Sequence, residues 1–549
     1  MMTRSLLRAS LALLCSCAAA RPYPLAPPMT VDDDRHPFLP QPPVAFSPFG
    51  WDAADNLAFR PMSSTFAVHP RHEAVNVNAV DEVPDSSWFT NRIGQTPMSP
   101  EEVARGPCVK PSPEVAFPWK VTGAKQDGAN PGFQITAANG VRYLLKFDDA
   151  NQPERATAAD AVGSKFYHAA GFHVPCNRVV SFRAEQLVVP ESASALQGKV
   201  ITRERVDELL KLAPHRPDGS FRAMASEWLA GKPIGPWNYD GVRVDDANDV
   251  VNHEDRRELR GSRLLGAWLN HFDARAQNTL AMWLSVPDGR GYVEHYILDW
   301  GDTLGSMWDW DPISRRLGYT YYLDLGAGMN DFVTFGAIER PWERAKFGPT
   351  GPTLAYFSDV DFDATSWKAG YPNPAFDAMS ERDGAWMARI MTRFDDATID
   401  KVVQEARFTD PVATTELARI LKARRDKTLA RYLSVLSTLT APRLEVVEGK
   451  TRLCLSDVAP GATATSEATA VALLDGGARP EWLPTDGTGG KACTVLPTTS
   501  QRYLVVDVRR PARKSPARVH LARDSRDDAP WQVVGLERPD RYQPPPSPK

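Results

Sequence analysis

The spacing of apolar and polar residues divides the chain into differently built regions. From residue 115 to about 440, strand-like runs come first and helical patterns follow, whereas after Pro442 only short apolar runs recur. Apolar residues three and four apart favour helices, and short β-rich runs bounded by turn residues favour strands. The succession predicts an α+β fold class, with a β-rich lobe, a helical lobe and a small all-β domain.

The helical half depends on a few periodic segments. From His253 to Asn270, one predicted helix carries Leu259, Leu264, Leu265, Trp268 and Leu269 on one face. An earlier helix begins at Arg155 and ends at Gly171, before Pro175. Further helices are predicted near 376–394, 397–408 and 414–437. The aromatic-rich stretch from Gly318 to Tyr371 lacks a period, which predicts an irregular insertion.

Six short apolar runs follow Pro442, separated by Gly, Pro, Asp and Ser. They are Thr451–Leu455, Ala470–Leu474, Cys493–Leu496, Tyr503–Val508, Ala517–Leu521 and Trp531–Leu536. This pattern predicts a small β-sandwich over residues 443–538, followed by a disordered tail, 539–549. Cys454 and Cys493 fall in two of the runs and are expected to form a disulfide in an oxidising compartment. Cys108 and Cys176 are a second possible pair.

The N-terminal region predicts export. Residues 1–20 combine two early arginines with a short apolar core, as a secretory signal does, and the core is too short to span a bilayer. Leu14–Cys17 resembles a bacterial lipoprotein box in which Cys17 is lipidated. Cleavage after Ala20 is the alternative and would release a secreted protein. The expected location is therefore the cell envelope, with membrane contact only through the lipid anchor.

Between the signal and the first predicted domain lie two further segments. Residues 21–50 are rich in proline, which suits a stiff tether. Residues 51–114 form an N-terminal extension, in which Trp88 and Phe89 are expected to anchor a core. The net charge of −4 and the pI near 6.2 argue against a nucleic-acid-binding protein. No cysteine pair or histidine cluster has the spacing of a zinc site.

Two short polar motifs carry the most specific chemical signal. His271–Asn278 has the form H-x-D-x-x-x-x-N, and Asp299–Gly301 has the form D-x-G after an apolar run. Two strand-like runs between them, 279–286 and 292–298, predict a β-hairpin with Asn278 at one end and Asp299 at the other. Antiparallel pairing would bring these two side chains together.

Phosphoryl transfer explains this choice of residues. The reaction needs charge placed around an anionic transition state more than it needs covalent chemistry from the protein. In the protein-kinase motifs of this form, the first Asp orients the attacking hydroxyl, and the Asn and the second Asp hold magnesium. The matching positions are Asp273 for the hydroxyl, and Asn278 and Asp299 for the metal.

Residues upstream of these two motifs fit the same chemistry. Gly123, Gly128 and Gly132 stand in a turn between strand-like runs, where backbone N–H groups could approach phosphates. Lys146 stands inside an apolar strand, Val141–Phe147, where an ammonium without a partner is costly to bury. A phosphate or a carboxylate would supply that partner.

Taken together, these residues resemble the protein-kinase-like superfamily. The motifs from Lys146 through Asp299 are nearest to its atypical HipA-like and phosphoinositide-kinase-like branches, over about residues 115–435. The resemblance implies a two-lobed kinase-like domain at 115–440 that binds ATP, or another nucleotide, with Mg²⁺. It also implies that Lys146 pairs with an acid of the following helix, preferably Asp160, with Glu154 as the alternative. Arg275 and Trp300 depart from the family pattern.

Two function classes follow from the resemblance. In the first, the protein is an exported atypical kinase that transfers phosphate to an unknown protein or small-molecule acceptor. In the second, it is a catalytically inactive, kinase-shaped binding or scaffold lipoprotein. Transfer of a nucleotidyl group from the same cleft is a third possibility that the sequence does not separate from kinase action.

Overall fold

The structure is a computed structural model whose chain forms two compact units. It describes residues 23–46, 49–66, 72–125, 130–194, 200–308, 310–459, 468–473, 480–486, 490–510, 515–525 and 529–539. The larger unit comprises Thr30–Asn76 and Val83–Tyr432. The smaller unit comprises the described parts of Met1–Met29, Val77–Glu82 and Leu433–Lys549. The predicted signal, Cys17 and most of the predicted tail lie outside the described residues.

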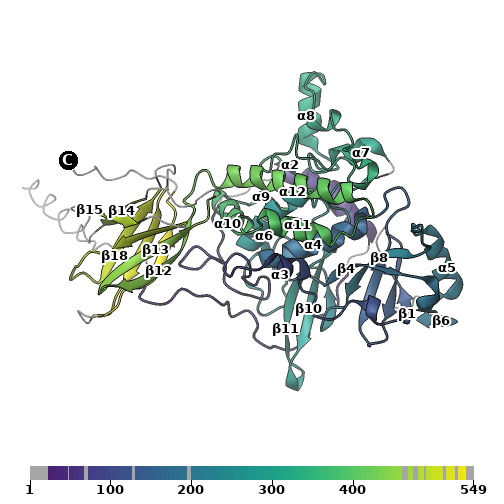
Figure 1. Cartoon of the computed structure of the whole chain (residues 1–549), viewed down its shortest axis with the longest axis horizontal. Coiled ribbons are helices and arrows are strands. Elements are labelled where there is room, and N and C mark those ends of the chain that lie inside the picture. Colours follow the sequence, from purple (N-terminus) through teal and green to yellow (C-terminus); the bar gives the residue numbers. More distant parts are fainter. Residues whose placement is uncertain are drawn as a thin grey trace, which may run out of the picture. The chain divides into compact units, whose positions relative to one another are not determined.

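A six-stranded sheet forms the first lobe of the larger unit (Figure 1). Its strands are β1 (Trp119–Ala124), β2 (Gly132–Thr136), β3 (Arg142–Lys146), β4 (Asn177–Phe182), β5 (Leu187–Val188) and β8 (Phe221–Glu227). Their order is β4-β8-β3-β2-β1-β5, and all neighbours are antiparallel except β1 and β5. Trp119, Phe133, Tyr143 and Phe147 belong to the buried core of this lobe. A short hairpin and a helix extend the lobe: β6 (Ser192–Ser194), β7 (Val200–Thr202) and α5 (Arg203–Leu212).

The predicted helix after Lys146 is present as α4 (Arg155–Ala170), which packs against β4 and β8. It ends at Gly171, whose φ of +136° is open to glycine and strained for other residues. A Cβ atom at this glycine would lie 2.2 Å from the ring of Phe89. Trp88 and Phe89 are buried, and Trp88 stacks on His295 with centroids 3.5 Å apart. The expected core-anchoring role of this aromatic pair is therefore confirmed.

Helices build the second lobe around a long hairpin. The helices are α3 (Pro100–Arg105), α6 (Arg257–Leu269), α9 (Pro374–Asp377), α10 (Glu381–Met391), α11 (Asp396–Gln404) and α12 (Pro411–Tyr432). The predicted hairpin is present as β10 (Thr279–Ser285) and β11 (Gly291–Ile297), with β9 (Lys232–Gly235) on the other edge of β10. Helix α6 packs against α10 and α12 and leads directly to His271.

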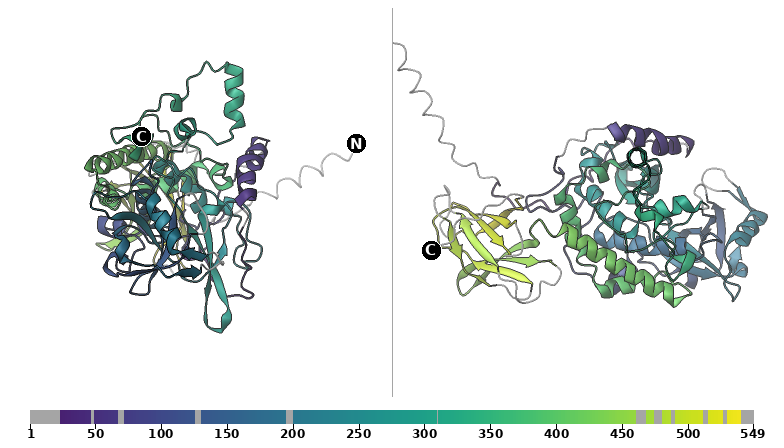
Figure 2. Two further views of the ribbon diagram at one scale, coloured as in Figure 1. Left: turned by 90° about the vertical axis from the view of Figure 1, so that its right-hand side faces the viewer. Right: turned by 90° about the horizontal axis from the view of Figure 1, so that it is seen from above.

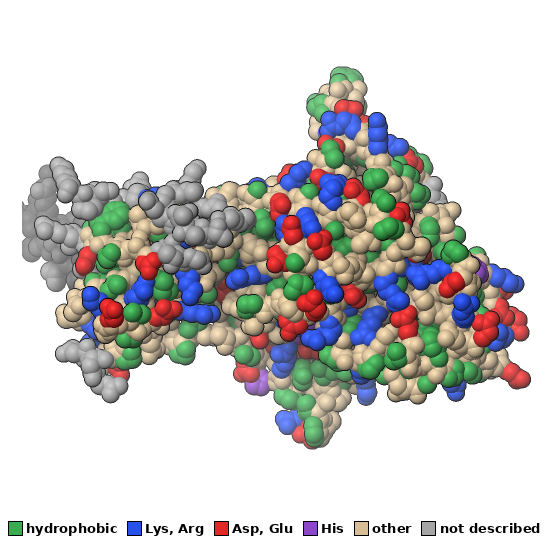
Figure 3. All heavy atoms as spheres, viewed as in Figure 1, with side chains coloured by type: hydrophobic (Ala, Val, Ile, Leu, Met, Phe, Trp, Pro, Cys, Tyr) green, Lys and Arg blue, Asp and Glu red, His purple; other side chains and the backbone are tan. Residues whose placement is uncertain are grey.

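Two helical segments were not predicted. The first is α1 (Phe49–Ala54), a π-helical turn (Asp55–Phe59) and α2 (Arg60–Phe66). The second comprises α7 (Asp311–Arg316), just before the stretch expected to be irregular, and α8 (Leu325–Thr334), which lies within it. In Figures 1 and 2, α8 stands out from its own unit, and Figure 3 shows hydrophobic side chains at its tip. The large apolar residues of α8, at positions 325, 329, 332 and 333, recur at helical spacing, so the expectation of an irregular stretch was wrong there. In the first segment, the π-helical turn interrupts the α-helical spacing.

Short 3₁₀ turns connect these elements. They cover Pro113–Val115, Ala184–Gln186, His253–Asp255, Ala276–Asn278, Pro287–Gly289, Pro341–Glu343 and Gly351–Thr353. The first residues of the predicted helix from His253 therefore form a 3₁₀ turn, and the α-helix begins at Arg257. Over the described residues, the chain has no helix that is long and apolar enough to cross a membrane.

The smaller unit is a two-sheet β structure around one core. Its strands are β12 (Leu439–Val447), β13 (Lys450–Asp457), β14 (Thr469–Leu473), β15 (Glu481–Leu483), β16 (Thr485–Asp486), β17 (Lys491–Val495), β18 (Tyr503–Arg509), β19 (Ala517–Ala522) and β20 (Gln532–Glu537). The sheet orders are β12-β13-β17-β16 and β15-β14-β18-β19-β20. All six predicted strands are present, and β12, β15 and β16 are additional. The predicted α+β class, with an all-β domain after a β-rich and a helical lobe, is confirmed.

Two disulfides connect elements of the described chain. Cys454 on β13 lies opposite Cys493 on β17, and the two are bonded as expected. Cys108, after α3, is bonded to Cys176, just before β4. Each bond closes a loop within one unit, so each restricts the unfolded state of that unit alone.

We expect the double substitution Cys454→Ala and Cys493→Ala to lower the free energy of unfolding of the smaller unit by about 2–4 kcal/mol, because the unfolded chain regains loop entropy. Chemical denaturation, followed by a probe in that unit, measures this change. As a control, Val446→Ala at an exposed position of β12 should change the same quantity by less than about 0.5 kcal/mol. An unchanged midpoint in the double variant would show that the bond contributes nothing.

Candidate functional site

Lys146 is the centre of an ion cluster in which Lys146 and Asp160 are buried and the side chain of Asp299 is 41% exposed. It is the last residue of β3, and its Nζ atom lies 2.8 Å from Oδ1 of Asp299 and 3.4 Å from Oδ2 of Asp160. The alternative partner, Glu154, instead accepts hydrogen bonds from the backbone N–H and the hydroxyl of Thr409. Two carboxylates therefore compensate the buried ammonium, and one of them comes from the D-x-G segment.

The three charges shift one another's pKa values. Burial raises the pKa of Asp160 to about 6, although Lys146 opposes this rise. Desolvation would also raise the pKa of Asp299, but the adjacent charge of Lys146 outweighs it and lowers that pKa to about 2. For Lys146, burial alone would lower the pKa, and the two carboxylates raise it above its ordinary value. Lys146 and Asp299 are thus both charged at neutral pH.

A tryptophan joins the D-x-G segment to helix α4. The backbone N–H of Trp300 donates to Oδ1 of Asp160 at 2.8 Å, and its fully buried ring lies 5.3 Å from the ring of Tyr167. A Cβ atom at Gly163 would lie 2.5 Å from the same indole. Gly163 therefore provides the space for Trp300, and any larger residue there would push the D-x-G segment away from α4.

The backbone around Asp299 is held in an unusual conformation. Asp299 has a φ of +56°, a left-handed value that costs a non-glycine residue of order 1–3 kcal/mol. Its carboxylate accepts a hydrogen bond from the backbone N–H of Gly301 at 3.3 Å, and Arg155 donates to the carbonyl of Gly301. A Cβ atom at Gly301 would lie 3.1 Å from Asp299 and 3.4 Å from the amide of Asn130. The segment is therefore fixed with its carboxylate aimed at Lys146.

Asp273 and Asn278 form the second half of the site. The side-chain amide of Asn278 donates to both the backbone carbonyl and Oδ2 of Asp273, each at 2.7 Å. The backbone carbonyl of Asn278 accepts a hydrogen bond from the backbone N–H of Leu298 at 2.8 Å, which closes the hairpin beside Asp299. This arrangement leaves the amide oxygen of Asn278 without a donor among the described residues, so it remains available as a ligand.

Arg275 holds the other oxygen of Asp273. Its Nε atom lies 3.0 Å from Oδ1 of Asp273, and its Nη1 atom lies 2.8 Å from Asp52 on α1. Burial raises the pKa of Asp273 to about 7, because the lowering by Arg275 is smaller than the desolvation and the repulsion from Asp302. A carboxyl group with this pKa is suited to accept a proton near neutral pH.

Two of the three glycines of the predicted phosphate-binding turn lie in strands. Gly123 lies at a bulge in β1, and Gly132 begins β2 opposite Lys146. A Cβ atom at Gly132 would lie 2.1 Å from the carbonyl oxygen of Leu145, so close packing already requires glycine there. Gly128 lies outside the described residues. Nearby, Lys125 donates to the carbonyl of Asn130 at 2.6 Å and lowers the pKa of Asp299 through its charge.

The described part of the chain contains no group of three His, Cys, Asp or Glu side chains placed to hold a metal ion. The candidate oxygens are the carboxylate of Asp299, beside Lys146, and the side-chain amide oxygen of Asn278, whose backbone pairs with Leu298 next to Asp299. Magnesium prefers oxygen ligands and is commonly bound by one or two protein oxygens together with substrate phosphates. The donor set therefore fits a magnesium ion that arrives with a nucleotide.

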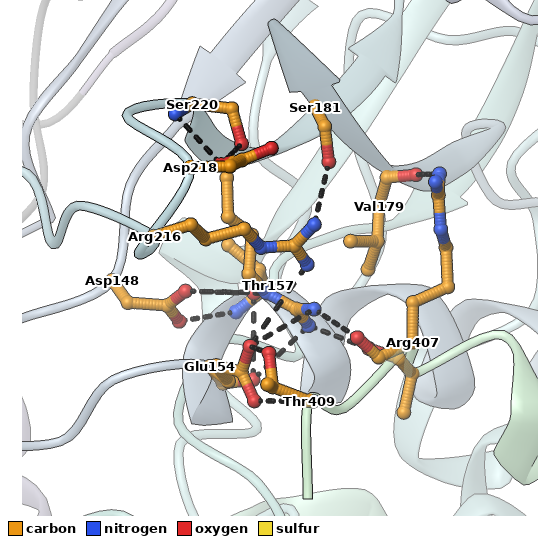
Figure 4. A network of polar contacts seen from close by, with 12 residues as sticks. Asp148, Glu154, Thr157, Val179, Ser181, Arg216, Asp218, Ser220, Arg407 and Thr409 are labelled. Atoms are coloured by element: carbon orange, nitrogen blue, oxygen red, sulfur yellow. Dashed lines mark hydrogen bonds and ion pairs between the residues drawn. The ribbon is translucent and has the colours of Figure 1, made fainter.

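A polar network fixes the start of α4, and with it Asp160 (Figure 4). Asp148 accepts from the backbone and the hydroxyl of Thr157, each at 2.8 Å. Arg222, buried on β8, donates to the Thr157 hydroxyl at 2.7 Å and to the carbonyls of Arg407 and Ala406 at 2.6 and 2.5 Å. The network thus ties the sheet and α4 to the loop between α11 and α12 in the helical lobe.

Sequence reasoning missed Gly163 and Arg222, although each left a signal. A glycine inside a helical pattern costs about 1 kcal/mol relative to alanine, which indicates a close packing partner at Gly163. Arg222 stands within the apolar run of β8, where a cation needs partners just as Lys146 does in β3. The contact of Arg275 with Asp52 joins segments more than two hundred residues apart and left no such signal.

Replacing Arg222 by Leu should lower the free energy of unfolding of the larger unit by about 3–5 kcal/mol. Asp148, which lies 3.6 Å from Arg222, and two backbone carbonyls would each lose a buried partner. Chemical denaturation followed by tryptophan fluorescence measures the loss. The control Arg290→Leu removes an exposed ion pair with Asp288 and should cost less than about 0.5 kcal/mol. Equal effects of the two substitutions would contradict a structural role for the network.

In sequence comparisons, no family model and no curated protein matches this chain. Among solved structures, the chain is similar to a Golgi casein kinase with Mn/ADP bound, at 11% identity and a TM-score of 0.21, over 54% of this chain and 75% of that chain. It is also similar to the twitchin kinase region from C. elegans, at 12% identity and a TM-score of 0.20, over 76% of each chain. Both TM-scores are low, so the functional conclusion depends on the geometry of the site.

Proposed function

We propose that this protein is a kinase-like phosphotransferase that moves the terminal phosphate of a magnesium-bound nucleotide to a hydroxyl acceptor. The observation that carries the proposal is the position of Lys146 between Asp160 and Asp299. A buried lysine paired with a helix acid and with the acid of a D-x-G segment gives a fixed positive charge beside a metal-binding carboxylate. Such a pair of charges suits a nucleotide's phosphates and their magnesium ion.

Asp299 and Asn278 would hold the magnesium ion, which when bound supplies positive charge that neutralises the phosphates. Lys146 binds the phosphate oxygens directly, and Asp160 keeps the lysine in place. Gly163 and Trp300 fix the distance between α4 and the D-x-G segment. The left-handed backbone at Asp299 is retained because the site needs its carboxylate in this direction.

Asp273 orients the acceptor hydroxyl and accepts its proton. One of its oxygens accepts a hydrogen bond from Asn278, and the other forms an ion pair with Arg275 that lacks hydrogen-bond geometry. A pKa near 7 means that the ionised form, which accepts a proton, is well populated at neutral pH. The role of Asp273 is therefore distinct from that of Asp299, whose low pKa keeps it ionised as a ligand.

A second candidate function is a kinase-shaped binding protein without catalysis. It is favoured by the fact that Lys146 already has two carboxylate partners and needs no phosphate to compensate its charge. In that case the cluster stabilises the packing of α4 against the sheet and binds no nucleotide. Nucleotide binding separates the two candidates.

The proposed location is the cell envelope, with lipidation at Cys17. The support is the pattern of residues 1–20 together with the two disulfides, because disulfides persist in oxidising compartments outside the cytosol. Labelling cells with a radioactive fatty acid, and comparing the full chain with a Cys17→Ala variant, tests this proposal.

Asp299→Ala should abolish magnesium-dependent nucleotide binding without unfolding the chain. A ligand that binds only the native state raises the melting temperature by mass action. A thermal-shift titration with ATP and Mg²⁺ should therefore show a rise for the wild type and none for the variant. The control Asp288→Ala, in the exposed turn of the hairpin, should behave as the wild type. An unchanged shift in Asp299→Ala would contradict the metal assignment.

The rate of magnesium-dependent ATP hydrolysis, with water in place of the acceptor, should rise with pH through about 7. Below that pH, Asp273 is protonated because its pKa is raised, so it cannot accept a proton; above it, the carboxylate is ionised. Arg275 lowers the pKa of Asp273, so Arg275→Gln should raise that pKa further. The midpoint of the pH–rate curve should therefore move upward by about one pH unit. A rate that does not change between about pH 6 and pH 8 would contradict the role of Asp273.

A further inference from the structure

A cavity lies against the loop that joins Asp273 to Asn278. Its volume is about 220 Å³, and all four residues between those two, Ala274 to Gln277, line it. The helical segment that sequence analysis did not predict forms another part of the lining, through Trp51, Asp52, Asp55, Asn56 and Arg60. The remaining lining residues are Pro236, Asn238, Tyr239, Pro372, Asn373 and Pro374. Asp273 itself does not line the cavity, but Arg275 does and lies 3.0 Å from the Asp273 carboxylate, so the cavity adjoins that residue.

The charged groups of this lining are paired with one another. Arg275 lies 2.8 Å from Asp52, and Arg60 lies 2.7 Å from Asp55. Arg275 also lies 3.0 Å from Asp273, and Arg60 lies 3.4 Å from Asp240, so both cations are fully compensated and leave no positive charge for an anionic ligand. A phosphate, a carboxylate or an ammonium group would have to break one of these partly buried pairs, which is costly.

Uncharged polar groups remain free to bind. The side-chain amides of Asn238 and Gln277 have no hydrogen-bond partner among the residues that the structure describes, and each offers two donors and an acceptor. The indole of Trp51 is 60% exposed at the same cavity and lies 5.7 Å from the ring of Phe59. An aromatic face beside amides suits a ligand with an apolar ring face and several hydroxyl groups.

The helical part of the lining contains a π-helical turn, Asp55–Phe59. Such turns are rare and occur frequently at functional sites. In this one, the amide of Asn56 donates to the backbone carbonyl of Asp52 at 2.9 Å and to its carboxylate at 3.0 Å. These bonds keep the Asp52 carboxylate next to Arg275. Because Arg275 also lies beside Asp273, the cavity lining is connected to Asp273 through Arg275.

From this lining we infer that the cavity binds the acceptor and that the acceptor is a neutral carbohydrate. The inference rests on the proposed phosphotransfer function. A sugar hydroxyl oxygen forms a bond to the terminal phosphorus of the nucleoside triphosphate, and the bond from that phosphorus to the nucleoside diphosphate breaks. The hydroxyl proton passes to the carboxylate of Asp273. Trp51 packs on the sugar ring, and Gln277 and Asn238 bind its other hydroxyls.

The test measures binding of three neutral oligosaccharides, maltotriose, cellotriose and chitotriose, to the full chain by titration calorimetry without nucleotide. We expect at least one of them to bind, and Trp51→Ala and Gln277→Ala each to weaken its binding about tenfold. Trp310→Ala is the matched control, because Trp310 is similarly exposed, at 63%, and does not line the cavity. This control should bind as the wild type does.

A second test uses ATP labelled in its terminal phosphate. The label should be transferred to the bound sugar, and Asp273→Asn should abolish this transfer. Absence of binding by all three sugars at millimolar concentration overturns the inference, as does binding that Trp51→Ala leaves unchanged. The ATP thermal shift, measured on the same preparations, distinguishes failure of the carbohydrate inference from failure of the proposed phosphotransfer function. With that shift present and no sugar bound, only the inference fails. With a sugar bound and no ATP shift, the proposed function fails and the acceptor role falls with it.

Discussion

The need to compensate one buried ammonium, that of Lys146, determines much of the larger unit. An uncompensated cation in the apolar sheet would cost several kcal/mol, and both Asp160 and Asp299 lie within ion-pair distance of it. The first fixes the position of α4 on the sheet, and the second fixes the end of the β10–β11 hairpin in the helical lobe. A single charge on β3 therefore requires three separate elements to meet.

Packing and hydrogen bonds then hold those elements at that meeting point. Trp300 fits against Gly163, so α4 and the D-x-G segment can approach only because the helix lacks a side chain there. Arg222 ties the start of α4 to the loop before α12 through hydrogen bonds that cross the two lobes. The ion cluster is therefore supported on both sides by contacts whose loss would move Asp160 or Asp299 away from Lys146.

Local signals explain what could be predicted from the sequence. Asp273 and Asn278 are five residues apart, and a hairpin joins Asn278 to Asp299, so spacing and turn residues were enough to bring them together. Lys146 was recognisable because an ammonium group inside an apolar strand needs a partner. The contacts of Trp300 with Gly163, of Arg222 with Ala406 and of Arg275 with Asp52 join distant segments. A local pattern indicates that Gly163 and Arg222 need a partner, but it does not identify that partner. A π-helical turn separates α1 from α2 and breaks the α-helical spacing, whereas the apolar residues of α8 keep that spacing, so α8 was predictable.

The most direct measurement uses an acyl-phosphate derivative of ATP, which acylates lysines that lie beside the bound phosphates, followed by peptide mass spectrometry of the full chain. The account predicts acylation of Lys146 that excess ATP with Mg²⁺ suppresses, because Lys146 binds the phosphates. Exposed lysines such as Lys110 and Lys232 serve as internal controls, since ATP should not protect them. An unlabelled Lys146, or labelling that ATP does not suppress, would contradict the central claim that Lys146 and Asp299 form a nucleotide site.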